Sequence, residues 1–246
     1  MCELSSIFFK MNIPENEIHI YQFPLADDRH QSEIDEFVKV LSPDEVVKAN
    51  RFKFNKHRSN YITSRYYLRI LTGNYIETKP EEIVFHYTDK DKPFIEFNDI
   101  KFNLAHSGNR CVFAFSKDND IGIDIEHKRE ISDAREICHR FFSDKEIADL
   151  NKVSDEQVSE AFLLCWTRKE AFIKAVGDGL SYPLAEFTVS LEKDNPEITG
   201  INKDQSEVKL WKMFNVDAGE EYLCSLAVKG AEQEKYVLFH MEIEKN

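Results

Sequence analysis

Two short segments carry side chains whose types and spacing could bind a metal ion. In residues 121–126, Ile-Gly-Ile-Asp-Ile-Glu, isoleucine alternates with Gly122, Asp124 and Glu126, and this period of two predicts a β-strand. Side chains two positions apart share one face of a strand, roughly 6.5–7 Å from each other. The carboxylates of Asp124 and Glu126 therefore point the same way and repel unless a cation lies between them. A hard divalent ion such as Mg²⁺, which takes oxygen ligands, suits this pair.

The second segment, residues 166–174, is predicted to be helical. Trp166, Glu170 and Lys174 recur every four residues, so they share one face of a helix. If that face meets the strand, Glu170 becomes a third carboxylate and Lys174 lies one turn beyond it. Each piece also has a plainer interpretation: a solvated outer face of a strand, a surface ion pair between Glu170 and Lys174, and a Trp166 that only packs.

Composition limits the class of protein. A chain of 246 residues with 42% hydrophobic and 12% aromatic residues can bury the core of one large domain or two small ones. It contains no run of 18 apolar residues, so we expect no transmembrane helix and no membrane partner. The beginning of the chain lacks the features of a secretory signal, and the five cysteines form no Cys-x-x-Cys motif. We therefore expect a cytoplasmic protein.

The charge distribution is uneven. The net charge of −13 makes nucleic acid an unfavourable partner, because phosphate binding needs a basic surface. From Lys48 to Arg69, however, seven lysines and arginines occur without a single acidic residue. This basic segment is either a solvated helix face or a surface that meets an anionic ligand.

Helices and strands are predicted in two successive sets. A strand at 18–23 precedes two helices, one begun by a Ser42–Glu45 capping box and one spanning about 56–71 and ending at Gly73. Short strands follow at 83–87, 94–97, 101–104 and 111–115. In the second set, the 121–126 strand precedes a helix with a capping box at residues 143–146. A long helix then begins at residues 154–157 and ends at Gly177, and strands follow at 187–191, 207–214, 222–228 and 236–243. The repeated order predicts an α+β fold of two α/β two-layer halves, residues 1–117 and 118–246, related by pseudo-symmetry.

Two further features could contact an anion. Residues 103–108, Asn-Leu-Ala-His-Ser-Gly, end a predicted strand in a small-residue loop whose amides could face a phosphate beside His106. Lys90 and Lys92 flank the turn before Pro93. His106 taken alone is better explained as an ordinary loop residue. Together with the acidic cluster, these groups fit a metal ion bridging a pyrophosphate, with extra cations for another phosphate of the same ligand.

Five segments in order resemble the 4′-phosphopantetheinyl transferases of the surfactin-synthetase-activating (Sfp) type. Each motif alone is weak, but the ordered set is specific, and the resemblance runs from about residue 18 to the end of the chain. The segments are 102–108 (Phe-Asn-Leu-Ala-His-Ser-Gly), 121–126, 140–143 (Arg-Phe-Phe-Ser), 166–174 (Trp-Thr-Arg-Lys-Glu-Ala-Phe-Ile-Lys) and 179–181 (Gly-Leu-Ser).

The resemblance implies a monomer of two similar halves that binds coenzyme A in the cleft between them. Such enzymes move phosphopantetheine from coenzyme A to a serine of an acyl, peptidyl or aryl carrier protein, as in nonribosomal peptide or polyketide synthesis, and release adenosine 3′,5′-bisphosphate. By position, Asp124, Glu126 and Glu170 would hold Mg²⁺, Glu170 would also be the base for the carrier serine, and Lys174 would assist the leaving phosphate. The region from Arg140 through the helix of Trp166 resembles the carrier-docking region.

The same resemblance implies a set of coenzyme A contacts. His106 matches a phosphate-contacting histidine, and Lys48 and Lys92 match further contacts. Lys90, Asp124 and Lys174 are predicted to join them.

Three positions depart from the family pattern. Ala105 stands where a phosphate-contacting serine is expected, and Glu45 replaces a lysine. The arginine expected in the second helix has no clear match, and Arg58 is the best candidate because Asn60 occupies the ungapped position. These departures concern the nucleotide end of the site more than its metal chemistry.

Two alternatives to a Mg²⁺-dependent transferase remain open. A non-catalytic homologue would bind coenzyme A or a carrier protein without turnover, although all three carboxylates and Lys174 are present. A Mg²⁺-dependent phosphohydrolase would use the same carboxylates on free nucleotides without a carrier.

Overall fold

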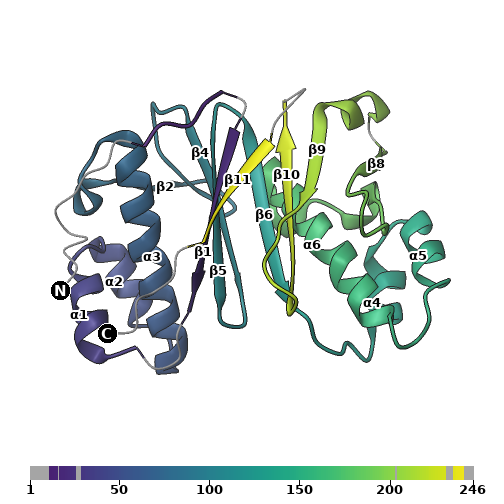
Figure 1. Cartoon of the computed structure of the whole chain (residues 1–246), viewed down its shortest axis with the longest axis horizontal. Coiled ribbons are helices and arrows are strands. Elements are labelled where there is room, and N and C mark those ends of the chain that lie inside the picture. The colour runs from purple at the N-terminus through teal and green to yellow at the C-terminus, as the bar shows by residue number, and fades with distance from the viewer. Residues whose placement is uncertain (1–10, 16, 26–28, 203, 231–234, 241–246) are drawn as a thin grey trace.

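The protein is built from two sheets packed face to face and covered by helices on both outer sides (Figure 1). The computed structural model describes residues 11–15, 17–25, 29–202, 204–230 and 235–240. Each sheet with its helices forms a two-layer α/β unit, so the predicted α+β fold class is confirmed. No helix in the described part of the chain combines the length and apolarity needed to cross a bilayer.

The first sheet has four strands in the order β11 (Lys235–His240), β1 (Glu17–Pro24), β5 (Arg110–Lys117) and β4 (Ile100–Ser107). β1 and β11 are parallel, and the other neighbours are antiparallel. The outer face is covered by α3 (Asn55–Ile76), whose Leu68 and Tyr75 pack on Phe113 and Phe115. The smaller elements of this side are α1 (Gln31–Val38), α2 (Pro43–Ala49), a 3-10 turn at Pro80–Glu82, and the hairpin β2 (His86–Tyr87) and β3 (Pro93–Phe94).

The second sheet has three antiparallel strands in the order β6 (Asp120–His127), β10 (Tyr222–Lys229) and β9 (Trp211–Asn215). The isoleucines of β6 pack inward against Ile18 and Ile20 of β1, so one face of β6 is apolar, as its alternation predicts. The long helix α6 (Val158–Val176) covers the other face. The remaining elements are α4 (Ala134–Phe141), α5 (Asp144–Leu150), the pair β7 (Phe187–Val189) and β8 (Ile198–Ile201), and 3-10 turns at Gly179–Ser181, Leu184–Glu186 and Gln205–Leu210.

The observed elements correct several predictions. The strand predicted at 207–214 is a 3-10 turn at Gln205–Leu210 followed by β9, and α1, α4 and β8 were not predicted. α3 continues through Gly73 to Ile76 because Gly73 serves a close contact rather than a helix end: an added Cβ would lie 2.6 Å from the Thr78 carbonyl oxygen. α6 begins at Val158 rather than at the Ser154 capping signal. The last predicted strand does not extend the second sheet, because β11 pairs with β1 in the first sheet.

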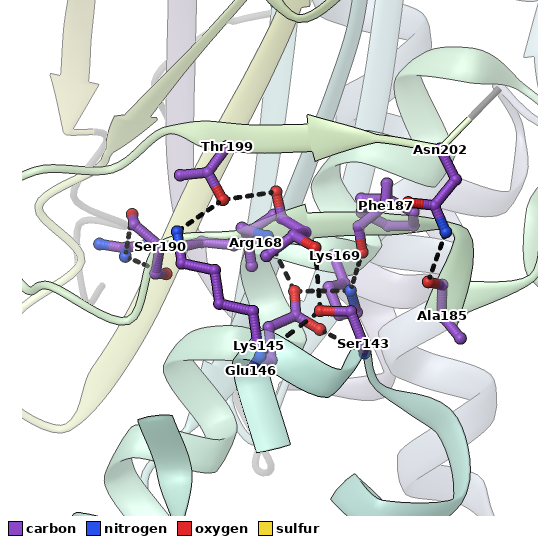
Figure 2. A network of polar contacts seen from close by, with 12 residues as sticks. Ser143, Lys145, Glu146, Arg168, Lys169, Ala185, Phe187, Ser190, Thr199 and Asn202 are labelled. Atoms are coloured by element: carbon purple, nitrogen blue, oxygen red, sulfur yellow. Dashed lines mark hydrogen bonds and ion pairs between the residues drawn. The ribbon is translucent and has the colours of Figure 1, made fainter. Parts of the chain in front are cut away.

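A buried glutamate attaches the short helix to the long helix on each side of the molecule. Ser42 and Ser143 begin α2 and α5, and their amides donate to Glu45 Oε2 at 3.0 Å and Glu146 Oε2 at 2.9 Å, so both predicted capping boxes are confirmed. Glu146 Oε1 also accepts from Lys169 Nζ of α6 at 2.7 Å, and Figure 2 shows Glu146 within this network. On the other side, Glu45 accepts from Arg65 and Arg69 of α3 at 2.6 Å each. These ion pairs attach α2 to α3 and α5 to α6.

The Glu146–Lys169 pair predicts a large stability effect. Both side chains are at most 1% exposed, and removing one partner of a buried ion pair costs about 3–5 kcal/mol. We expect Lys169→Met to lower the free energy of unfolding in urea by that amount and Lys145→Met, at an exposed neighbour, to change it little. Adding Glu146→Gln to Lys169→Met should restore part of the loss, because a neutral amide costs less to bury. Equal stability of Lys169→Met and the wild type would contradict this role.

Helix α6 lies unusually close to β6 at Gly122. A Cβ built on Gly122 would lie 2.1 Å from the Ala171 carbonyl oxygen and 2.3 Å from the Ala175 nitrogen. Both of these atoms belong to the α6 backbone, which cannot yield as a side chain can. Only glycine permits this approach, which brings the Asp124 side of β6 directly under the helix.

Gly122→Ala is therefore expected to push α6 away from the sheet. Overpacking in a core costs about 1–3 kcal/mol, and we expect at least this loss in urea unfolding. The matched control is Gly200→Ala in β8, where the nearest atom is the end of the flexible Gln205 side chain at 3.3 Å. If the two variants were equally stable, the close packing at Gly122 would not be required.

Candidate active site

The acidic strand and the long helix meet as their spacing predicts. Gly122, Asp124 and Glu126 share the face of β6 that lies under α6. Lys174 Nζ, from the last turn of α6, donates to Asp124 Oδ1 at 2.6 Å and to the Ile123 carbonyl oxygen at 3.4 Å. The contact joins residues 50 positions apart, and it depends on the close approach at Gly122.

Asp124 is the most buried of the three predicted metal-binding carboxylates, with 7% of the residue exposed. Burial raises the pKa of Asp124, and the charge of Lys174 opposes this increase. The second carboxylate oxygen, Oδ2, is buried and has no hydrogen-bond partner among the described residues. An unsatisfied carboxylate oxygen is costly to bury, which makes this atom a natural ligand for a cation.

Glu170 lies near enough to the other two acids to be affected by them. Burial raises the pKa of Glu170, the charge of Lys174 lowers it, and the negative charges of Asp124 and Glu126 raise it further. A carboxyl group with a raised pKa holds a proton more readily at neutral pH than an exposed glutamate does. Glu170 is thus suited to accept a proton from a reacting hydroxyl group.

Glu126 is held by two residues that the sequence analysis did not select. Its Oε2 accepts from Ser107 Oγ at 3.0 Å and from Arg129 NH1 at 2.7 Å. Ser107 also accepts from the His127 amide at 3.0 Å, so its hydroxyl group joins β4 to β6. No spacing rule identifies Ser107, because it lies 19 residues from Glu126 and the two meet only when the sheets pack.

The oxygen ligands offered by Asp124, Glu126 and Glu170 are of the type that a hard cation prefers, although the three side chains do not converge on a common point. In the described part of the chain, no three histidine, cysteine, aspartate or glutamate side chains are close enough together to hold a metal ion as they stand. Instead, Lys174 neutralises Asp124, and Arg129 neutralises Glu126. The free Oδ2 of Asp124 and the mutual repulsion of the three acids are what a bound cation would relieve.

A pocket of about 720 Å³ lies beside this cluster, lined by residues of both halves. Lys174 belongs to the lining and also contacts Asp124, so it connects the pocket to the carboxylates, which are not themselves among the lining residues. Five of the predicted coenzyme A contacts line the pocket, namely Lys48, Lys90, Lys92, His106 and Lys174. Arg58 does not: its Nε donates to Asn50 Oδ1 at 3.4 Å. Pocket-lining residues that were not predicted include Lys56, His57, Ser64, Arg65 and Tyr87.

His106 lies within β4 and not in a loop beyond it, because the strand continues to Ser107. His106 is one of the residues that line the pocket. The pKa of His106 is lowered, first by loss of hydration and then by the positive charges of Lys174 and His57. His106 is therefore a neutral hydrogen-bonding group at pH 7 and adds no positive charge to the pocket.

The basic segment is less basic than its sequence indicates. Arg65 and Arg69 are 6% and 1% exposed, and both are paired with Glu45. The single negative charge of buried Glu45 is shared by these two arginines, so it offsets one of the seven positive charges. Lys48 and Lys56 still line the pocket.

Comparisons with known proteins identify the family of the chain. Residues 13–118 match the family model described as "4'-phosphopantetheinyl transferase, N-terminal", and residues 120–227 match that of the 4'-phosphopantetheinyl transferase superfamily. Together the two matches cover both halves of the chain.

Three curated relatives extend over most of the chain. It is 32% identical to the 4'-phosphopantetheinyl transferase HetI of Nostoc sp., across 89% of this chain and 91% of HetI. It is also 32% identical to Sfp and 34% identical to ffp, two 4'-phosphopantetheinyl transferases of Bacillus subtilis, across 81% of this chain and 88% of each relative. The chain therefore belongs to the 4'-phosphopantetheinyl transferases and is a transferase enzyme.

The raised pKa of Glu170 predicts a pH-dependent penalty on stability. Between the unfolded pKa near 4.5 and the raised folded pKa, the native state binds more protons than the unfolded state, so stability falls as pH rises through this window. Above the window the penalty is complete. We therefore expect Glu170→Gln, without ligand, to melt at a higher temperature than the wild type at pH 7 and to lose this advantage below about pH 4.5.

Glu160→Gln on the same helix is the matched control, because the pKa of Glu160 is shifted in the opposite direction to that of Glu170. Hydrogen bonding to Lys193 lowers the pKa of Glu160, so this variant should be no more stable than the wild type at pH 7. A Glu170→Gln protein that is less stable than the wild type at pH 7 would disprove the electrostatic cost of the cluster.

Proposed function

We propose that this chain transfers the 4′-phosphopantetheine group from coenzyme A to a serine hydroxyl of an acyl or peptidyl carrier protein in a Mg²⁺-dependent reaction. The serine oxygen forms a bond to the β-phosphorus, the bond from that phosphorus to the bridging oxygen breaks, and adenosine 3′,5′-bisphosphate leaves. One observation carries the proposal: Lys174 lies both on the wall of a cation-lined pocket and on Asp124 of an acidic cluster. A pyrophosphate bound in this pocket would lie between cations and the proposed metal-binding group.

Asp124, Glu126 and Glu170 are the residues that would hold Mg²⁺. The ion, when bound, supplies positive charge to the pyrophosphate oxygens and so makes departure of the bisphosphate easier. Support comes from the buried, unpartnered Oδ2 of Asp124 and from the raised pKa of both Asp124 and Glu170.

The side chains of this protein divide the remaining work. Glu170 accepts the proton of the carrier serine, for which its raised pKa suits it. Lys174 turns from Asp124 toward the leaving phosphate and donates a hydrogen bond or a proton to it. Lys48, Lys90 and His106 bind coenzyme A along the pocket, His106 as a neutral donor. Lys92 and Arg58 were predicted to join them, but their observed hydrogen bonds lead elsewhere.

We also propose the division of labour predicted for the two halves. Residues 1–117 contribute most contacts to the nucleotide, whereas residues 118–246 contribute the metal ligands and, between Arg140 and Trp166, the carrier-docking surface. The enzyme acts as a cytoplasmic monomer. The pocket is supported as the shared site because Lys174, Gly177 and Gly179 line it opposite residues of the first half.

A binding-only homologue is the second candidate. It is favoured by the Lys174–Asp124 ion pair, which occupies one metal-binding oxygen in the absence of ligand. Tight coenzyme A binding in titration calorimetry without transfer to any carrier would support it.

Mass spectrometry of a panel of apo carrier proteins tests the proposal. Incubation with coenzyme A and Mg²⁺ should add one phosphopantetheine group to a carrier serine, and a serine-to-alanine carrier should gain nothing. Chelation by EDTA should stop the reaction and added Mg²⁺ should restore it. No mass gain on any carrier, with the protein folded and bound to coenzyme A, would contradict the transferase proposal.

Substitutions separate the roles within the cluster. Asp124→Ala or Glu170→Ala should reduce transfer by orders of magnitude while the fold persists, because each removes a proposed Mg²⁺ ligand and Glu170→Ala also removes the proposed base. Lys174→Ala should lower kcat far more than it weakens coenzyme A binding, because its contact forms with the leaving group. Retention of more than roughly a tenth of the wild-type rate by either carboxylate variant would contradict the metal assignment.

A further inference from the structure

Lys92 makes an unusual set of contacts across the boundary between the two halves. Its Nζ donates to the carbonyl oxygens of Lys174 at 2.6 Å, Ala175 at 3.3 Å and Ile121 at 3.3 Å. Two of these acceptors belong to the last turn of α6, and the third belongs to β6. A single side chain from the β2–β3 hairpin therefore holds the helix and the strand that carry the acidic cluster.

These acceptors need such a donor. The last carbonyl groups of a helix have no partner within it, and they lie at the negative end of its dipole. α6 ends at Val176, and Gly177 leaves the helix with a φ of 89°. Gly177 lies beside the Lys92 side chain, since a Cβ there would be in ordinary van der Waals contact with Lys92 Cδ, 3.9 Å away. The ammonium group thus caps the helix from outside.

The backbone of the hairpin is itself fixed, so Lys92 approaches from a defined direction. The amide of Lys92 donates to Thr88 Oγ1 at 3.2 Å, and its carbonyl oxygen accepts from the Thr88 amide at 3.0 Å. Pro93 follows directly and restricts the backbone further.

The ammonium group has no proton left for a phosphate. Lysine carries three N–H donors, and all three carbonyl acceptors lie within hydrogen-bond distance. Lys90, two residues away, is exposed and lines the same pocket. The two lysines therefore differ in their surroundings: Lys92 is bound to backbone carbonyl groups, whereas Lys90 is exposed. Both line the pocket, and both were predicted as coenzyme A contacts.

We propose that Lys92 is a positioning residue, which clamps the last turn of α6 to the first half and so holds Lys174 in register with Asp124 and the pocket. Lys174 is then fixed at both ends: its carbonyl oxygen is bound by Lys92, and its ammonium group is bound by Asp124. The proposal rests on the proposed transfer reaction for its kinetic effect, but the clamp itself does not depend on that reaction.

The test compares Lys92→Met, Lys92→Arg and Lys90→Met in the full-length protein. If Lys92 positions Lys174, Lys92→Met should lower kcat at least about tenfold and change the KM for coenzyme A less than about threefold. Lys92→Arg, which keeps a cation and several donors at this place, should recover much of kcat. Lys90→Met should show the opposite pattern, a raised KM with kcat nearly unchanged.

Hydrogen–deuterium exchange, measured without substrates, tests the clamp independently of catalysis. Lys92→Met should accelerate exchange in a peptide covering residues 173–179 but not in the middle of α6, and Lys92→Arg should restore protection. Wild-type protein that shows this protection but transfers nothing would leave the clamp standing and remove the transferase proposal.

Two outcomes would overturn the positioning role. One is a rise in KM and in the calorimetric Kd of coenzyme A for Lys92→Met at constant kcat, which would make Lys92 a direct ligand contact. The other is faster exchange or a lower melting temperature with unchanged kcat and KM, which would make it purely structural. If Lys92→Met does not fold, Lys92→Gln, which retains a donor amide, replaces it in both measurements.

Discussion

The distance between β6 and α6 is the constraint on which the candidate site depends. Because Gly122 has no side chain, the backbone of α6 contacts the strand directly at Ala171 and Ala175. Lys174 then reaches Asp124 with its ammonium group at 2.6 Å. Glu170, one turn earlier, lies in the field of both strand carboxylates. If β6 and α6 lay farther apart, the three carboxylates and Lys174 would not lie close enough together to act on one ligand.

The same construction principle holds both long helices in place. In each half, a Ser-x-x-Glu capping box begins a short helix, and its glutamate is buried against cations of the long helix. One carboxylate thus satisfies the end of one helix and fixes the orientation of another. The two halves use different cations, arginines of α3 and a lysine of α6. The two halves therefore share the position of a buried glutamate between a short and a long helix, although the residues that pair with it differ.

Local patterns predicted much of the architecture because their physical causes are local. The alternation in 121–126 and the capping boxes at Ser42 and Ser143 depend on residues two or three apart, and all were confirmed. The pairing of β11 with β1 was not predicted, because nothing near residues 235–240 specifies which sheet they join. The burial of Arg65 and Arg69 was likewise not predicted, because their shared partner Glu45 lies 20 and 24 residues away in the chain. The contacts of Ser107 and Lys92 required the packed structure, as they link segments 19 and 82 residues apart.

The charges of the cluster are held at a cost that a ligand can relieve. Asp124 and Glu170 both have raised pKa values, and one oxygen of Asp124 is buried without a described partner. Lys174 offsets part of this cost while the pocket beside it is free. Under the proposed function, binding of a pyrophosphate with a divalent cation would provide each of these groups with a better partner, and the ion pair would be the arrangement of the site before the ligand binds.

The most direct test is a crystal structure with coenzyme A and Mn²⁺ in place of Mg²⁺, with anomalous diffraction used to locate the metal. The account predicts a metal peak within ligand distance of Asp124 and Glu170, with Lys174 released from Asp124 and directed at the pyrophosphate. A metal peak elsewhere, or coenzyme A bound while Lys174 remains on Asp124 and no metal enters, would contradict it.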